Sequence, residues 1–166
     1  MPRVLIAGSF DPFTKGHLFL VQRALDLFGQ VTVAVLDNRE KTYLFSLEER
    51  EQIAKRSCSG LSGVNVLSSH EMLYEFCKKH RFNFILKGIR DEKDCGYELL
   101  QAEYNRAHGV ETILIPSPAE LAKVNATYVR EQLKAGAKEN CSDYISEEMY
   151  AFLERLLKEK EKKAER

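Results

Sequence analysis

The sequence predicts an α/β fold in which a parallel sheet of about five strands is covered by helices on both faces. Two observations lead to this prediction. Short apolar runs rich in β-branched residues recur through the first two thirds of the chain, and helical patterns separate them. Strands that alternate with helices pair in parallel through right-handed crossovers, which place helices against the sheet. The expected strands cover residues 4–7, 31–36, 64–67, 83–86 and 112–115.

Helices are expected between these strands. Ser46 and Glu49 form a capping box that opens the helix LEEREQIAKR. Residues 71–80 and 97–108 are the next two candidates. The first helix shows its buried face in apolar side chains spaced three or four residues apart, at Leu18, Val21, Leu25 and Phe28.

After the last strand the pattern changes to loops and two further helices. A loop with two prolines leads to a helix over residues 127–135, for which Thr127 is a candidate cap and Gly136 the end. Ser146 caps a terminal helix that extends to about Lys158. Residues 159–166 form a charged tail of mixed sign, which is typical of a solvated helix end or a frayed terminus.

Length and charge limit the domain organisation and the partners. A chain of 166 residues can form one domain with a sizeable core, so we expect a single domain over residues 1–166. Lys and Arg together number 25, as do Asp and Glu, and this balance provides no bulk charge for binding nucleic acid or a membrane. Any anion site must therefore be local.

The cysteine spacing and the length of the apolar runs indicate where in the cell the protein is located. The four cysteines (Cys58, Cys77, Cys95 and Cys141) are far apart, which argues against a thiolate zinc site and a disulfide framework. The apolar run in MPRVLIAG is too short for a signal peptide, and VTVAVL is far below the length of a membrane span. We therefore expect a soluble, cytoplasmic protein with reduced thiols.

The stretch GSFDPFTKGH, from Gly8 to His17, connects the first expected strand to the first helix. Ligands of open parallel sheets bind beyond the carboxyl ends of the strands, where this stretch lies. Its backbone donors and the helix start offer positive charge to a phosphate, and Gly8 and Gly16 allow close approach. The glycine order matches neither the dinucleotide fingerprint nor the P-loop. His17 either donates to a phosphate oxygen or only caps the helix.

Three other segments favour anions at the same edge of the sheet. KGIR, residues 87–90, follows the strand NFIL, Lys41 lies in the loop after the second strand, and VNATYVRE, residues 124–131, opens a late helix. Each segment alone is a weak signal, because a loop lysine is usually solvated and a helix start needs only a cap. Because one sheet edge gathers them into one crevice, together they indicate a polyphosphate ligand.

The run GSFDPFTKGH resembles the signature G-[ST]-F-D-P-x-T-x-G-H of the bacterial phosphopantetheine adenylyltransferase family, nucleotidyltransferases that carry HxGH or TxGH. Relatives acting on nicotinamide mononucleotide or glycerol 3-phosphate typically have histidine at the position of Thr14. The resemblance continues through FSLEER, through KGIRDEKDCGYE against RG[LI]R…[FY]EYE, through NR at 105–106, and through VNATYVRE against ISS[ST]xVRE. It covers nearly the whole chain and implies a single Rossmann-like nucleotidyltransferase domain.

The resemblance implies that ATP and 4'-phosphopantetheine react, with magnesium, to give dephospho-coenzyme A and pyrophosphate. It also implies a homohexamer. The implied catalytic residues are His17, Lys41 and Arg90. The implied acceptor site contains Ser9, Lys41, Leu73 and Lys87. The implied ATP site contains Ser9, Phe10, His17, Gly88, Ile89, Arg90, Glu98, Leu121, Ala122, Lys123, Val124, Asn125, Ala126 and Thr127.

This chemistry suits the residue types. The nucleophile is a phosphate oxygen that is already ionised at neutral pH, so no general base is needed. Catalysis consists of holding two polyanions in line and neutralising charge on the α-phosphate and the leaving pyrophosphate. Asp11, beside Pro12, is expected to fix the turn rather than to act as a base. The scattered histidines show no zinc spacing, so no protein metal site is expected.

Two departures from the family pattern leave alternatives open. Lys87 stands where the family has arginine, which keeps the charge but loses the bidentate fork. Asn125 and Ala126 replace two serines, and alanine lacks a hydroxyl that could donate to phosphate. The first alternative is adenylyl transfer to another phosphorylated acceptor, such as a mononucleotide. The second is a nucleotide-binding sensor without turnover.

Overall fold

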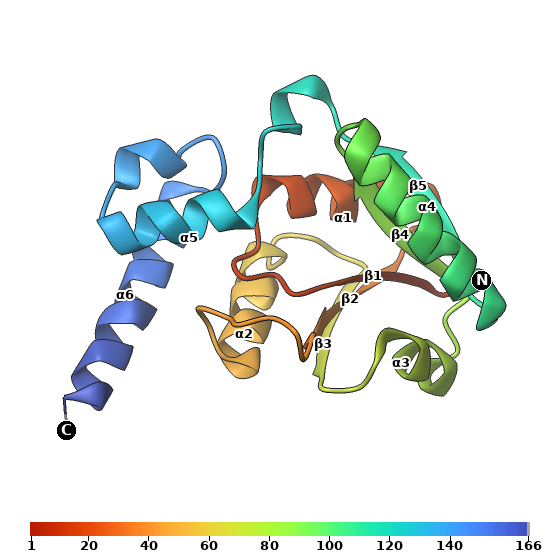
Figure 1. The fold of residues 1–166 in the computed structure, drawn as a ribbon, viewed down its shortest axis with the longest axis horizontal. Helices are drawn as coiled ribbons and strands as arrows, with labels where there is room; N and C mark the ends of the chain where they lie inside the picture. Colours follow the sequence, from red (N-terminus) through yellow and green to blue (C-terminus); the bar gives the residue numbers. More distant parts are fainter. Residues whose placement is uncertain (166) are drawn as a thin grey trace.

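The structure, a computed structural model, describes residues 1–165 and contains a five-stranded parallel sheet in the order β3-β2-β1-β4-β5 (Figure 1). The predicted fold class is confirmed. The strands are β1 Val4–Gly8, β2 Val31–Leu36, β3 Val64–Ser69, β4 Phe84–Ile89 and β5 Glu111–Pro116.

Helices follow every strand. The four crossover or edge helices are α1 Lys15–Phe28, α2 Leu47–Ser57, α3 Leu73–His80 and α4 Glu92–Ala107. After β5 the chain forms the short 3-10 helix η1 Ala119–Leu121, α5 Ala126–Ala135, a second 3-10 helix η2 Lys138–Cys141, and α6 Glu147–Ala164. Within the described residues, no helix is both long enough and apolar enough to cross a bilayer.

The sheet has a buried core on each face, because side chains alternate along each strand. Val4 and Ile6 of β1 belong to one apolar cluster, which also contains side chains of α1, α2, α5 and α6. Leu5 and Ala7 belong to the other cluster, together with Phe76 of α3. β1 is therefore buried on both sides, as its continuous apolar run predicts.

The strand order places a topological switch point between β1 and β4. From β1 the chain proceeds outward through β2 to β3, and then crosses over to β4 and β5 on the other side of β1. The segments that leave β1 and β4 at their carboxyl ends therefore diverge. In open α/β sheets this divergence creates the crevice in which ligands bind.

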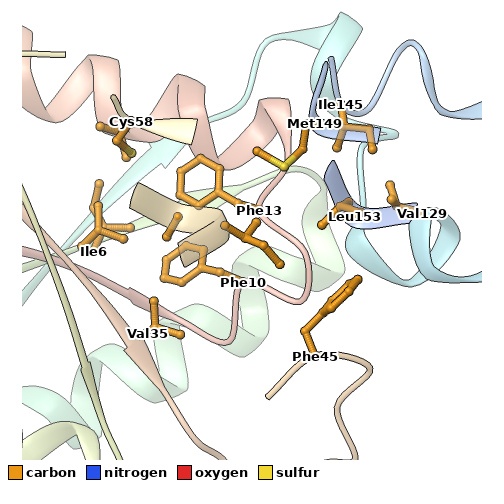
Figure 2. Close-up of a cluster of buried hydrophobic side chains, with 14 of the residues drawn as sticks. Ile6, Phe10, Phe13, Val35, Phe45, Cys58, Val129, Ile145, Met149 and Leu153 are labelled. Carbon is orange, nitrogen blue, oxygen red and sulfur yellow. The ribbon is translucent and has the colours of Figure 1, made fainter. Parts of the chain in front are cut away.

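The loop that leaves β1 is anchored in the core by two aromatic rings. Phe10 and Phe13 are both buried, and their ring centroids lie 5.2 Å apart. Figure 2 shows them among side chains of the C-terminal helices, including Val129 of α5 and Met149 and Leu153 of α6. The helices after the sheet thus support the residues 8–14, which we call the signature loop.

Several element bounds differ from the expectations. β4 extends through Ile89, because Lys87 and Gly88 pair with Leu114 and Ile115 of β5. Polar residues at the end of a buried run had suggested a loop there. α4 begins at Glu92 rather than residue 97, since the side chain of Asp91 caps it.

The late helices differ as well. Thr127 does not cap α5: the Asn125 side chain accepts a hydrogen bond from the Tyr128 N–H and is the cap. α3 begins at Leu73, two residues later than expected. α6 continues to Ala164, so most of the charged tail is helical, and residue 166 lies outside the described residues.

Candidate active site

Two adjoining cavities open at the carboxyl edge of the sheet, at the switch point. Their volumes are about 390 Å³ and about 460 Å³. The first lies over the ends of β1 and β4, and the second lies beside the signature loop. Both are lined by Phe10, His17, Lys41, Ala126 and Thr127.

The structure brings together parts of all four segments that the sequence singled out. Lys87, Gly88, Arg90, Glu98, Leu121, Val124 and Asn125 line the first cavity only, and Ser9 lines the second only. Other residues lie elsewhere. Leu73 packs against the core cluster beside α3, and Lys123 is exposed and pairs with Asp143 at 2.6 Å. Ile89 and Ala122 are half-buried and line neither cavity.

His17 occupies the first turn of α1 and also closes the end of that helix. Its Nδ1 accepts a hydrogen bond from the backbone N–H of Thr14 at 3.0 Å, and it lies 3.2 Å from the Thr14 hydroxyl. A ring nitrogen that accepts an N–H carries no proton, so the neutral imidazole holds its proton on Nε2. The capping interpretation of His17 is therefore confirmed, and its Nε2–H remains free of the helix as a donor directed to neither Thr14 atom.

The surroundings of His17 favour its neutral form. The ring lies against Phe10 and Phe13, with centroid distances of 4.9 and 5.3 Å. Burial among these rings, followed by the charges of Arg90 and Lys87, lowers the pKa of His17 to about 4. At neutral pH the imidazole is therefore an uncharged hydrogen-bond donor.

Arg90 is held at the mouth of the first cavity by a carboxylate and a carbonyl. Its Nε lies 3.3 Å from Oδ2 of Asp94, its backbone N–H donates to the same oxygen at 3.0 Å, and its Nη1 donates to the Val124 carbonyl at 3.4 Å. Asp94 lies in the first turn of α4, so its position follows from the helix. These contacts aim a charged guanidinium along the cavity edge.

Lys87 and Glu98 face each other within the first cavity. Lys87 Nζ lies 3.9 Å from Oε2 of Glu98, which is beyond hydrogen-bond distance. That oxygen is buried and has no hydrogen-bond partner among the described residues. A buried carboxylate oxygen without a donor is costly, so the site fits a ligand that brings hydroxyl or amine donors to Glu98.

Asp11 connects the signature loop to the loop that carries Lys41. Its carboxylate is buried and accepts hydrogen bonds from the backbone N–H groups of Leu44 at 2.8 Å and Phe45 at 3.0 Å. The expectation that Asp11 fixes its own turn thus missed its main contacts, which lie 33 and 34 residues away. Arg130 contacts the same residue, donating to the Asp11 carbonyl at 2.7 Å.

Gly8 lines the first cavity and leaves little room for a side chain beside Phe10. A Cβ at this position would lie 3.2 Å from the Phe10 ring, which folds back over it. Gly16 and Gly88 are not restricted in this way, because their nearest neighbours would lie 3.6 and 3.8 Å away.

Four residues contribute to the site without having been singled out from the sequence: Tyr43, Arg50, Asp94 and Arg130. Each of the charged residues lies on a helix rich in other charged residues, so its burial has no local sequence signal. The family-like segments FSLEER and VRE contain Arg50 and Arg130 and were the available clue.

The cytidylyltransferase-like family matches residues 5–132. A phosphopantetheine adenylyltransferase of Pseudarthrobacter chlorophenolicus is 38% identical over 159 residues, covering 95% of this chain and 93% of its own. One from Actinobacillus pleuropneumoniae serotype 3 is 40% identical over 130 residues, covering 77% of this chain and 82% of its own.

A solved structure gives the same fold at low sequence identity. The lipopolysaccharide core biosynthesis protein from Thermoplasma volcanium superposes with a TM-score of 0.53 at 18% identity, covering 71% of this chain and 97% of that one. This likeness concerns the arrangement of the sheet and helices alone.

Proposed function

Because this chain belongs to the phosphopantetheine adenylyltransferase family, within the cytidylyltransferase-like proteins, we propose that it transfers the adenylyl group of ATP to 4'-phosphopantetheine. The products are dephospho-coenzyme A and pyrophosphate, in the biosynthesis of coenzyme A. The chain is accordingly a nucleotidyltransferase.

One observation carries the proposal: three cations and a neutral histidine donor line the first of two adjoining cavities at the switch point. Lys41, Lys87, Arg90 and His17 all line the first cavity, and Lys41 and His17 also line the second. Two connected spaces suit two phosphorylated substrates that meet at one phosphorus atom. The shared residues lie where the spaces meet, and so where the reaction takes place.

The residues support an in-line displacement. An oxygen of the acceptor phosphate attacks the α-phosphorus of ATP, and the bond from that phosphorus to the bridging oxygen of pyrophosphate breaks. Negative charge moves to the leaving group, and no proton needs to be removed from the nucleophile. The His17 Nε2–H donates to a non-bridging α-phosphate oxygen as charge develops, while Lys41 and Arg90 stabilise the attacking and leaving phosphates.

The substrate-binding roles follow from the same positions. Lys87 and Lys41 hold the acceptor phosphate, with Ser9 at the junction of the two substrates. Glu98 receives donor groups of the nucleoside, which satisfies its unpartnered oxygen. Asn125, Ala126 and Thr127 border the nucleotide at the start of α5, where backbone N–H groups and the helix end favour phosphate.

Magnesium enters this proposal with ATP rather than through a protein site. Among the described residues no group of three or more His, Cys, Asp and Glu side chains could hold a metal ion. Mg²⁺ is commonly held by substrate phosphates and water with few carboxylates, and the cation-rich lining here fits a metal carried by the phosphates. Its chemistry would be to neutralise phosphate charge.

The proposal includes a homo-oligomer, which the family resemblance implies is a hexamer. It is supported by α4, which buries polar side chains and exposes apolar ones. Its buried residues are the polar Glu98 and Asn105. Its exposed residues include Tyr97, Leu99, Leu100 and Tyr104, which are 60%, 53%, 67% and 50% accessible. An apolar outer face of this kind is typical of an interface, and we assign it to further copies of the chain.

The proposed location is the cytoplasm. All four cysteines are free thiols, and Cys58, Cys77 and Cys141 are buried. Such thiols suit a reducing compartment. Burial also raises the pKa of Cys58 and Cys77 to about 11, which keeps both thiols protonated and unreactive.

The test is pyrophosphate release from ATP and Mg²⁺ with a panel of phosphorylated acceptors. Release with 4'-phosphopantetheine, accompanied by dephospho-coenzyme A in the product mixture, is expected. Release only with a mononucleotide or another phosphate would reassign the acceptor. Tight ATP binding without release in any mixture would make the protein a nucleotide sensor instead.

A further inference from the structure

Arg50 is a buried cation outside both cavities. Its side chain is 1% exposed, although it lies on α2, the most polar helix by sequence. The guanidinium donates to three backbone carbonyls, those of Ser9 at 2.9 Å, Leu36 at 3.3 Å and Phe45 at 3.1 Å. It also forms an ion pair with Asp37. A buried charge with this many partners is an organising contact, since each lost partner would leave a polar group unsatisfied.

These partners lie on two separate loops and at the end of β2. Asp37 and Phe45 lie near the two ends of residues 37–46, which we call the Lys41 loop, and Leu36 is the last residue of β2 before it. Ser9 belongs to the signature loop. One planar group therefore fixes the base of the Lys41 loop and its distance from the Ser9 peptide. The planar guanidinium of arginine can donate to several acceptors at once in a fixed geometry. The compact ammonium group of a lysine cannot reproduce this arrangement.

Two neighbours extend this contact. The Tyr43 ring lies over the guanidinium at 3.9 Å, and its hydroxyl is 3.3 Å from the Ser9 hydroxyl and accepts the Asn38 N–H at 2.6 Å. The other oxygen of Asp37 lies 2.5 Å from Nδ1 of His70. The contacts of Arg50 and His70 outweigh the burial of Asp37 and lower its pKa, so Asp37 stays ionised as the counter-charge.

We propose that Arg50 is a positioning residue that sets the spacing between Ser9 and Lys41, and thereby aligns the acceptor phosphate with the nucleotide. Lys41 is itself exposed and forms no side-chain ion pair among the described residues, so only the shape of its loop directs it into the cavities. This role rests on the proposed function. Arg50 acts through Lys41 and Ser9 and touches neither substrate.

The first measurement is steady-state turnover of Arg50→Lys with varied 4'-phosphopantetheine. Lysine preserves the charge opposite Asp37 but cannot hold three carbonyls. We expect the Michaelis constant for the acceptor to rise about tenfold and the turnover number to fall, the scale of one lost charge-assisted hydrogen bond. Arg56→Lys is the matched control: it is the same change on the same helix, where Arg56 stacks on Phe152 at 4.6 Å.

The second measurement is a double-mutant cycle with Lys41→Ala. If Arg50 acts through Lys41, the Arg50→Lys change costs less than about twofold once Lys41 is absent. A merely structural role would give the same loss in both backgrounds. Asp37→Asn provides a second variant should Arg50→Lys fail to fold, because it leaves the guanidinium and its carbonyl contacts in place. It should raise the acceptor constant about threefold and show the same dependence on Lys41.

The third measurement does not depend on activity. Hydrogen exchange of the ligand-free protein should be about tenfold faster over residues 38–45 in Arg50→Lys, on the scale of one lost hydrogen bond, and unchanged in Arg56→Lys. Wild-type protein that releases no pyrophosphate would refute the proposed function but leave this comparison valid. Unchanged exchange, or acceptor constants and turnover within twofold of wild type in both Arg50→Lys and Asp37→Asn, would overturn the positioning role.

Discussion

The backbone N–H of Thr14 donates to Nδ1 of His17 across 3.0 Å, so the start of α1 fixes which nitrogen of the imidazole carries the proton. The helix thereby makes Nε2–H a donor without any need for protonation. Burial lowers the pKa of His17 to about 4 and thereby also keeps the imidazole neutral. At neutral pH the imidazole of His17 is therefore uncharged and carries its proton on Nε2.

His17→Ala should reduce turnover by roughly 10²–10³, the usual loss for one donor aimed at developing negative charge. ATP affinity should change far less, because the donor acts mainly in the transition state. Turnover and ATP binding by calorimetry measure the two effects. His17→Asn is the control for capping, since its amide oxygen can accept the Thr14 N–H while its shorter side chain falls short of the phosphate. Near-normal turnover in His17→Asn would reduce His17 to a cap.

Stability should fall as pH is lowered from about 6.5 to about 4, and His17 should contribute to that fall. The unfolded imidazole has its ordinary pKa of about 6.5, whereas the folded one titrates near 4, so the unfolded state binds more protons in this interval. Urea unfolding at pH 7 and pH 5 measures the effect. The drop in unfolding free energy should be larger for wild type than for His17→Asn, and equal drops would contradict the lowered pKa.

Lys41→Ala should raise the Michaelis constant for the acceptor and lower turnover together, because a loop cation that reaches the acceptor phosphate serves both binding and reaction. Arg39 lies in the same exposed loop but lines neither cavity. The Michaelis constant and turnover of Arg39→Ala should therefore stay within about twofold of wild type, the scale of a surface substitution. Steady-state pyrophosphate release compares the two variants. Matching behaviour would make Lys41 an ordinary solvated residue.

Lys87→Ala should weaken acceptor binding more than Lys87→Arg does. Without Lys87, an acceptor phosphate and Glu98 would face each other in a partly desolvated cavity without an intervening cation. Arginine restores the charge and adds a second donor, so it should keep or tighten binding if its planar head fits. Acceptor constants of the three proteins decide the matter. Equal constants for wild type and Lys87→Ala would show that Lys87 does not meet the acceptor.

Gly96→Ala should stabilise the protein by about 0.5–1 kcal/mol, because Gly96 lies inside α4 and a Cβ there meets nothing within 4 Å. Gly136→Ala is the matched comparison. It also has open space, but its φ of +68° lies in the left-handed region, so alanine should destabilise there. Urea denaturation at one fixed protein concentration measures both changes. Shifts of the same sign would contradict the backbone argument.

The sheet could be predicted because its two central strands, β1 and β2, are buried along almost their whole length and consist mainly of apolar, β-branched residues. VTVAVL is apolar except for Thr32, and β2 covers Val31–Leu36 as expected. The predicted strand ends were wrong where a strand continues into polar residues. β4 continues through Lys87 and Gly88, whose charge and lack of a side chain disguise their pairing with β5.

The site was predictable at its glycine-rich and cationic segments, but not in its internal connections. α4 buries Glu98 and Asn105 and exposes leucines, so its sequence pattern gave a late start and no inner face. The burial of Arg50 depends on carbonyls contributed by residues up to 41 positions away, and the Asp11 carboxylate is satisfied 33 positions away. Contacts of this range arise only when the sheet is assembled.

The last helix, α6, supports the Lys41 loop, although it is synthesised after every other part of the site. Lys160 of α6 donates to the Leu44 carbonyl at 2.6 Å and pairs with Glu49 at 3.0 Å. The five strands, the signature loop and the Lys41 loop all precede residue 117 and leave the ribosome first. The Lys41 loop acquires its contact from α6 only when translation is nearly finished, and a nascent chain or a product of a late stop codon has the sheet without that contact.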